Sequence, residues 1–150
     1  MNSFTAQREI EAPVEHVWDV LTDLDGAVEI LSGVTRIERL DGAGYAVGTR
    51  WRETRKIMGK EATEEMVVTE VEPRRRTVIA AEAGDISYRT EFTVAPTATG
   101  TLLTMTFAGT SNATGVRALL EKLMAPLGTA VTRKMMTADL ADIARAAQAR

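Results

Sequence analysis

Several residue types that commonly carry chemistry are scarce or missing in this sequence. The 150 residues include no cysteine and a single histidine, His16. The missing cysteine excludes disulfides, thiol nucleophiles and thiolate metal sites, and one imidazole cannot build a metal site from several histidines. No serine stands in a Gly-x-Ser-x-Gly motif, and no glycine cluster opens a helix as a phosphate-binding loop would. The sequence therefore predicts neither a metal nor a cofactor.

An excess of charge of one sign and long apolar runs are also lacking. The net charge is −3, so no strong field would attract nucleic acid or an acidic membrane. No apolar run approaches the roughly 20 residues that cross a bilayer. The N-terminus has no basic segment followed by an apolar one, the pattern of a signal peptide. We expect a cytoplasmic protein with no nucleic-acid partner and no membrane span.

What is present is a long stretch of helical periodicity in the last quarter of the chain, residues 114–148. Spacings of three and four residues put its apolar side chains along one helical face. We expect Asn112 or Thr114 to cap this helix and Pro126 to kink or break it. The face consists of Val116, Leu120, Leu123, Leu127, Val131 and Met135, and a shifted stripe continues it through Met136, Leu140, Ile143 and Ala147.

Strand-like segments fill most of the chain before this helix. They are separated by turn residues and predict an antiparallel sheet. A short helix is expected at 14–22, and 23–31 is either a loop or a second short helix. With 45% hydrophobic residues, the chain forms one α+β domain, a curved sheet that grips the C-terminal helix. The expected strands are 3–11, 34–40, 49–58, 61–72, 76–83, 86–95 and 101–110.

Hairpin pairing assigns one face of the sheet to the interior, because residues opposite each other share a face. A turn centred on Gly59-Lys60 would place Arg55 opposite Glu64. The opposite face is charged and should be solvated. The predicted inner face carries Trp51, Glu53, Arg55, Glu64, Met66, Val68, Ile79, Ala81, Tyr88, Thr90, Phe92, Leu103, Met105 and Phe107.

Three charged residues on this inner face are unusual. Glu53, Arg55 and Glu64 lie among aromatics and methionines, and burying charge is costly unless it is paired. Polar groups that converge inside an apolar concavity are typical of a small-molecule site. They could anchor a ligand carboxylate, phenol or carbonyl, or act as an acid/base pair. The alternative is a purely structural ion pair.

The whole chain resembles the START-related helix-grip superfamily, also called SRPBCC, and within it the polyketide cyclase/dehydrase branch. The resemblance implies a seven-stranded antiparallel sheet, two short helices after the first strand and a long C-terminal helix around a cavity. Members include lipid and hormone carriers, aromatic cyclases and partner-binding proteins, and they share no catalytic motif that could be transferred. The matching segments are residues 10–21 (IEAPVEHVWDVL), Asp23, 33–34, 47–51, 68–71 with Pro73, and 100–101.

Three functional hypotheses follow for this single START-like domain, residues 1–150. The favoured one is a carrier or sensor of a small hydrophobic or amphipathic molecule. The second is a cofactor-independent cyclase or dehydratase, with Glu53, Arg55 and Glu64 as catalytic candidates. The third is an interaction module, with a homodimer as one form, which predicts a large apolar outer patch. The predicted ligand-binding residues are Trp51, Glu53, Arg55, Glu64, Met66, Val68, Tyr88, Thr90, Phe92, Met105, Phe107, Met124 and Met135.

Overall fold

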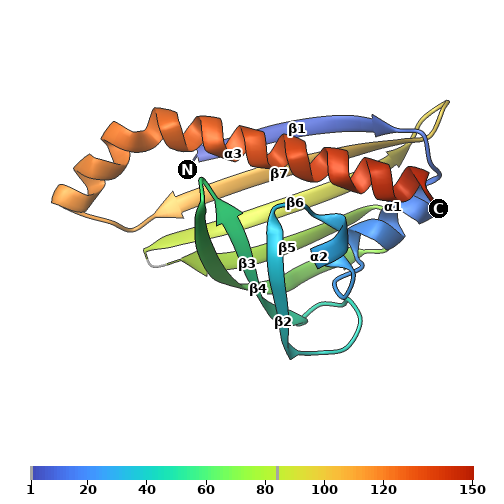
Figure 1. Ribbon diagram of the computed structural model, residues 1–150, viewed down its shortest axis with the longest axis horizontal. Helices are drawn as coiled ribbons and strands as arrows, with labels where there is room; N and C mark the ends of the chain where they lie inside the picture. Colours follow the sequence, from blue (N-terminus) through green and yellow to red (C-terminus); the bar gives the residue numbers. More distant parts are fainter. Residues whose placement is uncertain (1, 84) are drawn as a thin grey trace.

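A computed structural model describes residues 2–83 and 85–150, without the side chains of 2, 83 and 121–127. Its seven strands form one antiparallel sheet in the order β1-β7-β6-β5-β4-β3-β2. The sheet curves around the long helix α3, as predicted (Figure 1). The elements are β1 (Asn2–Ile10), α1 (Val14–Leu21), α2 (Ala27–Ile30), β2 (Val34–Asp41), β3 (Arg50–Ile57), β4 (Lys60–Glu72), β5 (Arg76–Ala83), β6 (Ile86–Pro96), β7 (Thr101–Ser111) and α3 (Val116–Gln148).

The β3–β4 hairpin turns one residue earlier than the sequence predicted. Met58 and Gly59 both have positive φ, 52° and 79°, as a two-residue hairpin turn of type I′ requires. Arg55 therefore pairs with Ala62, and Glu53 pairs with Glu64. The predicted Arg55–Glu64 pair is wrong by two residues. A shift of two leaves every side chain on its predicted face, since strand side chains alternate with a period of two.

The next two hairpins also place residues of the predicted inner face opposite each other. Ala81 pairs with Tyr88 across β5 and β6, and Phe92 pairs with Met105 across β6 and β7. The strand β4 carries a bulge between Val68 and Glu70. Because a bulge bends its strand and increases the local twist, it contributes to the curvature that lets the sheet close around the helix.

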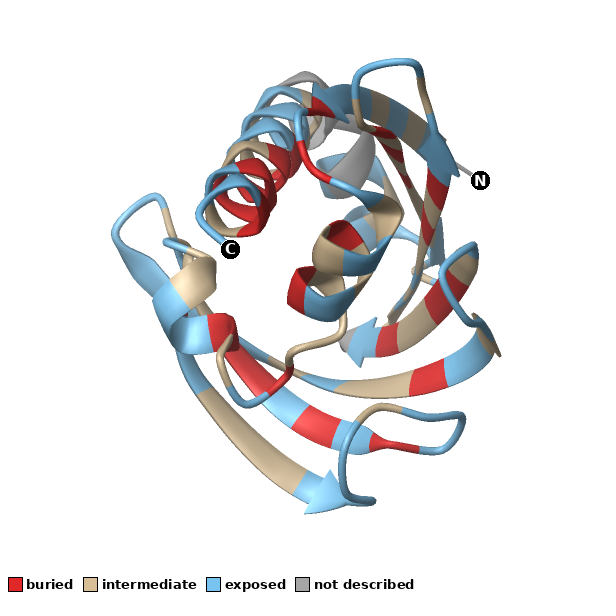
Figure 2. Cartoon of the chain, turned by 90° about the vertical axis from the view of Figure 1, so that its right-hand side faces the viewer, coloured by how far each residue is buried: buried red, intermediate tan, exposed pale blue. Residues whose placement is uncertain are grey.

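The main core lies where α1 and the C-terminal half of α3 meet β1, β6 and β7. In Figure 2 the sheet forms an arc around the two helices, and buried residues lie on their facing sides. Burial of these apolar side chains is the main term that holds the helices on the sheet. The fully buried residues of this core include Ile10, Val17, Leu103, Met136 and Ala147.

The N-terminal part of α3 differs from the prediction. The helix runs unbroken through Pro126 and Gly128, although its axis bends in the first third (Figure 1). Its N-cap is Gly115, with no side-chain capping bond, instead of Asn112 or Thr114. Within the predicted apolar stripe, Val116 and Leu120 are exposed, because the first turns of the helix extend past the end of the sheet (Figure 1), whereas its C-terminal members from Met136 on are buried. The side chains of Leu123 and Leu127 lie outside the described residues.

Candidate functional site

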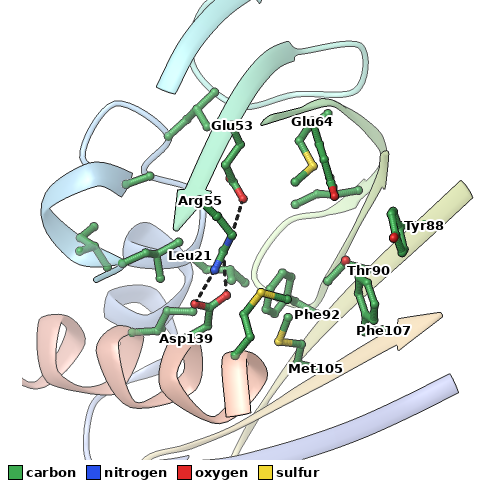
Figure 3. Close-up of a pocket in the computed structure, with 18 of the residues that line it drawn as sticks. Leu21, Glu53, Arg55, Glu64, Tyr88, Thr90, Phe92, Met105, Phe107 and Asp139 are labelled. Carbon is green, nitrogen blue, oxygen red and sulfur yellow. Dashed lines mark hydrogen bonds and ion pairs between the residues drawn. The ribbon is translucent and has the colours of Figure 1, made fainter. Parts of the chain in front are cut away.

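A cavity of about 250 Å³ lies between the concave face of the sheet, the α1–α2 segment and the second half of α3. Most of its wall is apolar, and Figure 3 shows side chains from sheet and helices converging on it. The alternation of each strand sends every second side chain inward, so neighbouring strands build a continuous wall. The apolar lining includes Leu21, Leu24, Ile30, Trp51, Met66, Ile79, Phe92, Met105, Phe107, Val131 and Met135.

Arg55 connects β3 to α3 across one side of the cavity. Its Nε donates to Glu53 Oε2 at 2.8 Å. Its Nη1 and Nη2 donate to the two carboxylate oxygens of Asp139 at 3.0 and 2.9 Å (Figure 3). The guanidinium and both carboxylates are largely buried, with side-chain exposures of 15%, 9% and 6%. Although burial alone would lower the pKa of Arg55, attraction to Asp139 and Glu53 outweighs burial and raises it.

Glu53 is also held by its own strand neighbour. The indole Nε1 of Trp51 donates to Glu53 Oε1 at 3.3 Å, so both oxygens of this buried carboxylate have donors. A buried charge with such partners escapes most of the cost of desolvation. Two carboxylates and one cation thus form an ion group at the cavity wall in which each carboxylate oxygen has a hydrogen-bond donor.

Glu64 stands apart from this group. It pairs with Glu53 across β3 and β4, and its carboxyl points into the cavity (Figure 3). Burial raises its pKa, the charge of Glu53 raises it further, and Arg55 opposes both effects. Among the residues that the structure describes, nothing makes a hydrogen bond or ion pair with this carboxyl. Glu64 is therefore the group best placed to accept a hydrogen bond from a molecule in the cavity, or to exchange a proton with it.

Most of the predicted site residues line the cavity. Tyr88 stacks on Phe107, with ring centroids 5.3 Å apart, and Thr90 lies on the same wall. Val68 is buried beside Trp51 but does not contribute to the lining. The side chain of Met124 lies outside the described residues. The predicted residues found in the lining are Trp51, Glu53, Arg55, Glu64, Met66, Tyr88, Thr90, Phe92, Met105, Phe107 and Met135.

Sequence reasoning missed four polar lining residues, Asp23, Tyr45, Thr132 and Asp139. Asp139 had a visible signal, since it lies four residues after Met135 and four before Ile143, within the apolar stripe of α3. An acid at such a position needs a buried partner. Tyr45 shares a 2.8 Å hydrogen bond with Thr77, and burial raises its pKa to about 12. Its loop position gave no comparable signal.

The described residues gather no group of three or more side chains suited to hold a metal ion. In the same part of the chain, no helix has the length and apolarity to cross a membrane. The cavity wall presents hydrogen-bonding groups, charged groups and apolar surface to a molecule inside it.

A curved antiparallel sheet that wraps a long C-terminal helix and encloses a mainly apolar cavity defines the helix-grip class of proteins. The chain belongs to the family described as polyketide cyclase/dehydrase and lipid transport, whose model matches residues 1–148. The family resemblance seen in the sequence is confirmed. None of the curated protein sequences matches this chain.

Solved structures support the same fold. TTHA0849 from Thermus thermophilus is 22% identical, with a TM-score of 0.83 over 99% of this chain and 98% of its own. The Zhui aromatase/cyclase from Streptomyces sp. R1128 is 18% identical, with a TM-score of 0.84 over 98% and 93%. The di-domain aromatase/cyclase BexL, from the BE-7585A biosynthetic pathway, is 18% identical and has a TM-score of 0.82. The match spans 99% of this chain and 50% of BexL.

Proposed function

We propose that the protein binds a small, mainly apolar molecule in the cavity between the sheet and α3. The observation that carries this proposal is a mainly apolar space into which the carboxyl of Glu64 projects without a hydrogen-bond or ion-pair partner among the described residues. Ligand sites are concave and apolar with a few convergent polar groups. The aromatic and methionine walls would supply the affinity, and Glu64 with Thr90 would orient the ligand.

The size of the cavity limits the ligand. Its volume of about 250 Å³ lies just below the range of roughly 300–1,000 Å³ that is common for ligand pockets. Three methionines, Met66, Met105 and Met135, line it, and methionine adapts readily to different shapes. A compact aromatic or alicyclic molecule fits this space better than a long acyl chain.

A ligand screen with a blocked variant tests the proposal. Neutral aromatic compounds, flavonoids and short lipids are screened by thermal shift and native mass spectrometry, and a binder at 100 times its Kd should add about 2.7 kcal/mol of stability. Thr90→Phe would fill the cavity and abolish the shift. The control Thr106→Phe adds the same ring to the opposite face of the neighbouring strand, where Thr106 contacts Thr5, and should leave binding intact. Equal binding by both variants would exclude the cavity as the site.

An enzyme of the cyclase or dehydratase type is the second candidate. The observation that favours it is the raised pKa of Glu64 inside the cavity, since a carboxyl with a pKa closer to neutrality transfers protons efficiently at physiological pH. Ring closure by aldol chemistry needs a base to remove a proton next to a carbonyl and an acid to protonate the resulting alkoxide. Glu64 could fill both roles in turn.

Substitution of the two glutamates separates catalysis from binding. With a poly-β-ketone substrate, Glu64→Gln should abolish turnover and preserve the binding of neutral ligands. Glu53→Gln should reduce turnover as well, because Glu53 sets the electrostatic environment of Glu64. Full activity in both variants would rule out carboxylate catalysis at this site.

A further inference from the structure

We propose that the cavity selects molecules whose polar end is a hydrogen-bond donor, an ammonium group above all, and rejects carboxylates. This inference rests on the proposed binding function and names the ligand class. It reverses the expectation that Arg55 would anchor a ligand carboxylate.

Arg55 already has two carboxylate partners within the protein. A guanidinium has five N–H donors, and three of those of Arg55 point to Glu53 and Asp139 at 2.8 to 3.0 Å. Two carboxylates therefore surround one cation. An incoming carboxylate would have to displace one of them or join two negative groups around the same guanidinium, and like charges at close range repel strongly in a low-dielectric interior.

Acidic side chains outnumber basic ones in the described lining of the cavity. The lining holds four carboxyl groups, those of Asp23, Glu53, Glu64 and Asp139, and its only cationic side chain in the described part of the chain is Arg55. One oxygen of Asp23 accepts the Gly26 N–H at 3.0 Å. A cation that enters this space reduces an excess of negative charge, whereas an anion adds to it.

The carboxyl of Glu64 is placed to receive the polar end of a ligand. Its carboxyl faces the cavity across from Thr90 and Phe107 (Figure 3), and no described residue donates a hydrogen bond to it. A ligand ammonium or hydroxyl at this position gains a charge-assisted hydrogen bond, while the apolar body rests on the aromatic and methionine walls. Burial and Glu53 raise the pKa of Glu64, and a bound cation would offset both effects.

Three probes that share one naphthalene ring test the inference on the wild-type protein. They are 1-naphthylmethylamine, 1-naphthalenemethanol and 1-naphthoate, with affinities measured by calorimetry at pH 8. We expect the amine to bind about tenfold more tightly than the alcohol, and the carboxylate about tenfold more weakly. Equal affinities for amine and alcohol, or tightest binding of the carboxylate, would overturn the inference and leave the binding function standing. Failure of all three probes, together with an empty ligand screen, would refute both.

A pair of adjacent substitutions assigns the preference to Glu64. Glu64→Gln keeps the size of the side chain and removes its charge, so the preference for amine over alcohol should fall about tenfold while the affinity for the alcohol changes less than about threefold. The control is Glu65→Gln, the next residue of β4, whose exposed side chain pairs with Arg50 at 3.5 Å on the outer face. An unchanged preference in a folded Glu64→Gln protein would overturn the assignment. If that variant fails to fold, the order of the three probes on the wild type decides.

Discussion

Arg55 shows how a charged residue can be kept inside an apolar wall. A buried ion pair gains little net stability over apolar residues of the same shape, because desolvation cancels much of the attraction. Removal of only one partner is strongly destabilising, since it leaves an uncompensated buried charge. The bidentate contact with Asp139 therefore fixes the position of α3 relative to β3, two elements that face each other across the cavity.

Removal of Asp139 should destabilise the fold strongly. Asp139→Ala leaves Arg55 with one carboxylate in place of two, and breaking a buried pair costs about 3 kcal/mol. Urea unfolding followed by the fluorescence of Trp18 and Trp51 measures the loss. The control Glu38→Ala removes exposed pairs with Arg36 and Arg52, in which the side chain of Glu38 is 43% exposed and those of the two arginines are 71% and 48% exposed. It should cost less than about 1 kcal/mol. A loss below about 1 kcal/mol for Asp139→Ala would show that the ion group is not structurally important.

The carboxyl of Glu64 should make stability depend on pH. Its pKa is raised in the folded state, so the folded protein binds this proton more tightly than the unfolded chain does. The contribution of Glu64 to the free energy of unfolding is fully present below its pKa in the unfolded chain, about 4.3. This contribution is lost as the pH rises through the higher pKa of the folded state. The titratable or charged groups that share the cavity with it are Asp23, Tyr45, Glu53, Arg55, Tyr88 and Asp139.

Glu64→Gln removes that pH dependence. The variant should melt at a higher temperature than the wild type at pH values above the raised pKa of Glu64, where the wild-type carboxyl is charged, and the difference should shrink as the pH falls toward about 4.5. The effect is expected to stay within about 1 kcal/mol, because the side chain is only partly buried. Melting curves of both proteins across this pH range give the comparison. A constant difference at every pH would contradict a shifted pKa at Glu64.

At the scale of the elements, close contact between strand ends fixes the start of β7. A Cβ added to Gly100 would lie 2.1 Å from the carbonyl oxygen of Ile10 at the end of β1. Next to it, Thr101 Oγ1 donates to the Ala12 carbonyl at 2.8 Å and is fully buried. The chain passes so close here that only a glycine fits.

Gly100→Ala should therefore cost about 2 kcal/mol, because the backbone of β1 or β7 must move to relieve the overlap. Gly128→Ala is the matched control. In the described part of the chain, no atom beyond the helix's own backbone and the two neighbouring residues lies within 4 Å of the Cβ it would add, and alanine in a helix interior is favoured over glycine by roughly 0.5–1 kcal/mol. Chemical denaturation of the two variants should show opposite signs. A neutral result for Gly100→Ala would mean that the strand ends tolerate separation.

The β3–β4 hairpin illustrates what a sequence can and cannot predict about such elements. Alternation of side chains identified the inner face of both strands, and burial enforces that choice at every second residue. The turn was misplaced because Met58 in a left-handed conformation is uncommon for a residue without a polar side chain, and Gly59-Lys60 looked like the better centre. Glu53 therefore faces Glu64, and Arg55 finds its second partner on α3, far away in the sequence.

At the scale of the whole molecule, periodicity predicted the α+β architecture, but long-range contacts within the site did not follow from it. The strands and α3 were visible in local patterns. The partner of Arg55 depends on where α3 crosses the sheet, a property of the packed fold that no local window contains. The exposed start of α3 was missed for the same reason, since its stripe has the same period whether or not the sheet reaches that far.

Side chains at the two ends of α3 should therefore contribute unequally to the free energy of unfolding. Leu140 is 3% exposed, whereas Leu119 and Leu120 are 58% and 55% exposed. Leu140→Ala should cost about 2–5 kcal/mol through lost burial and a new cavity, while Leu119→Ala and Leu120→Ala should each change stability by less than about 0.5 kcal/mol. Urea titrations of the three variants compare the two ends of the helix directly. A large loss at Leu119 or Leu120 would show that the first turns are covered in solution, as the interaction-module hypothesis requires, because an exposed leucine has no burial to lose.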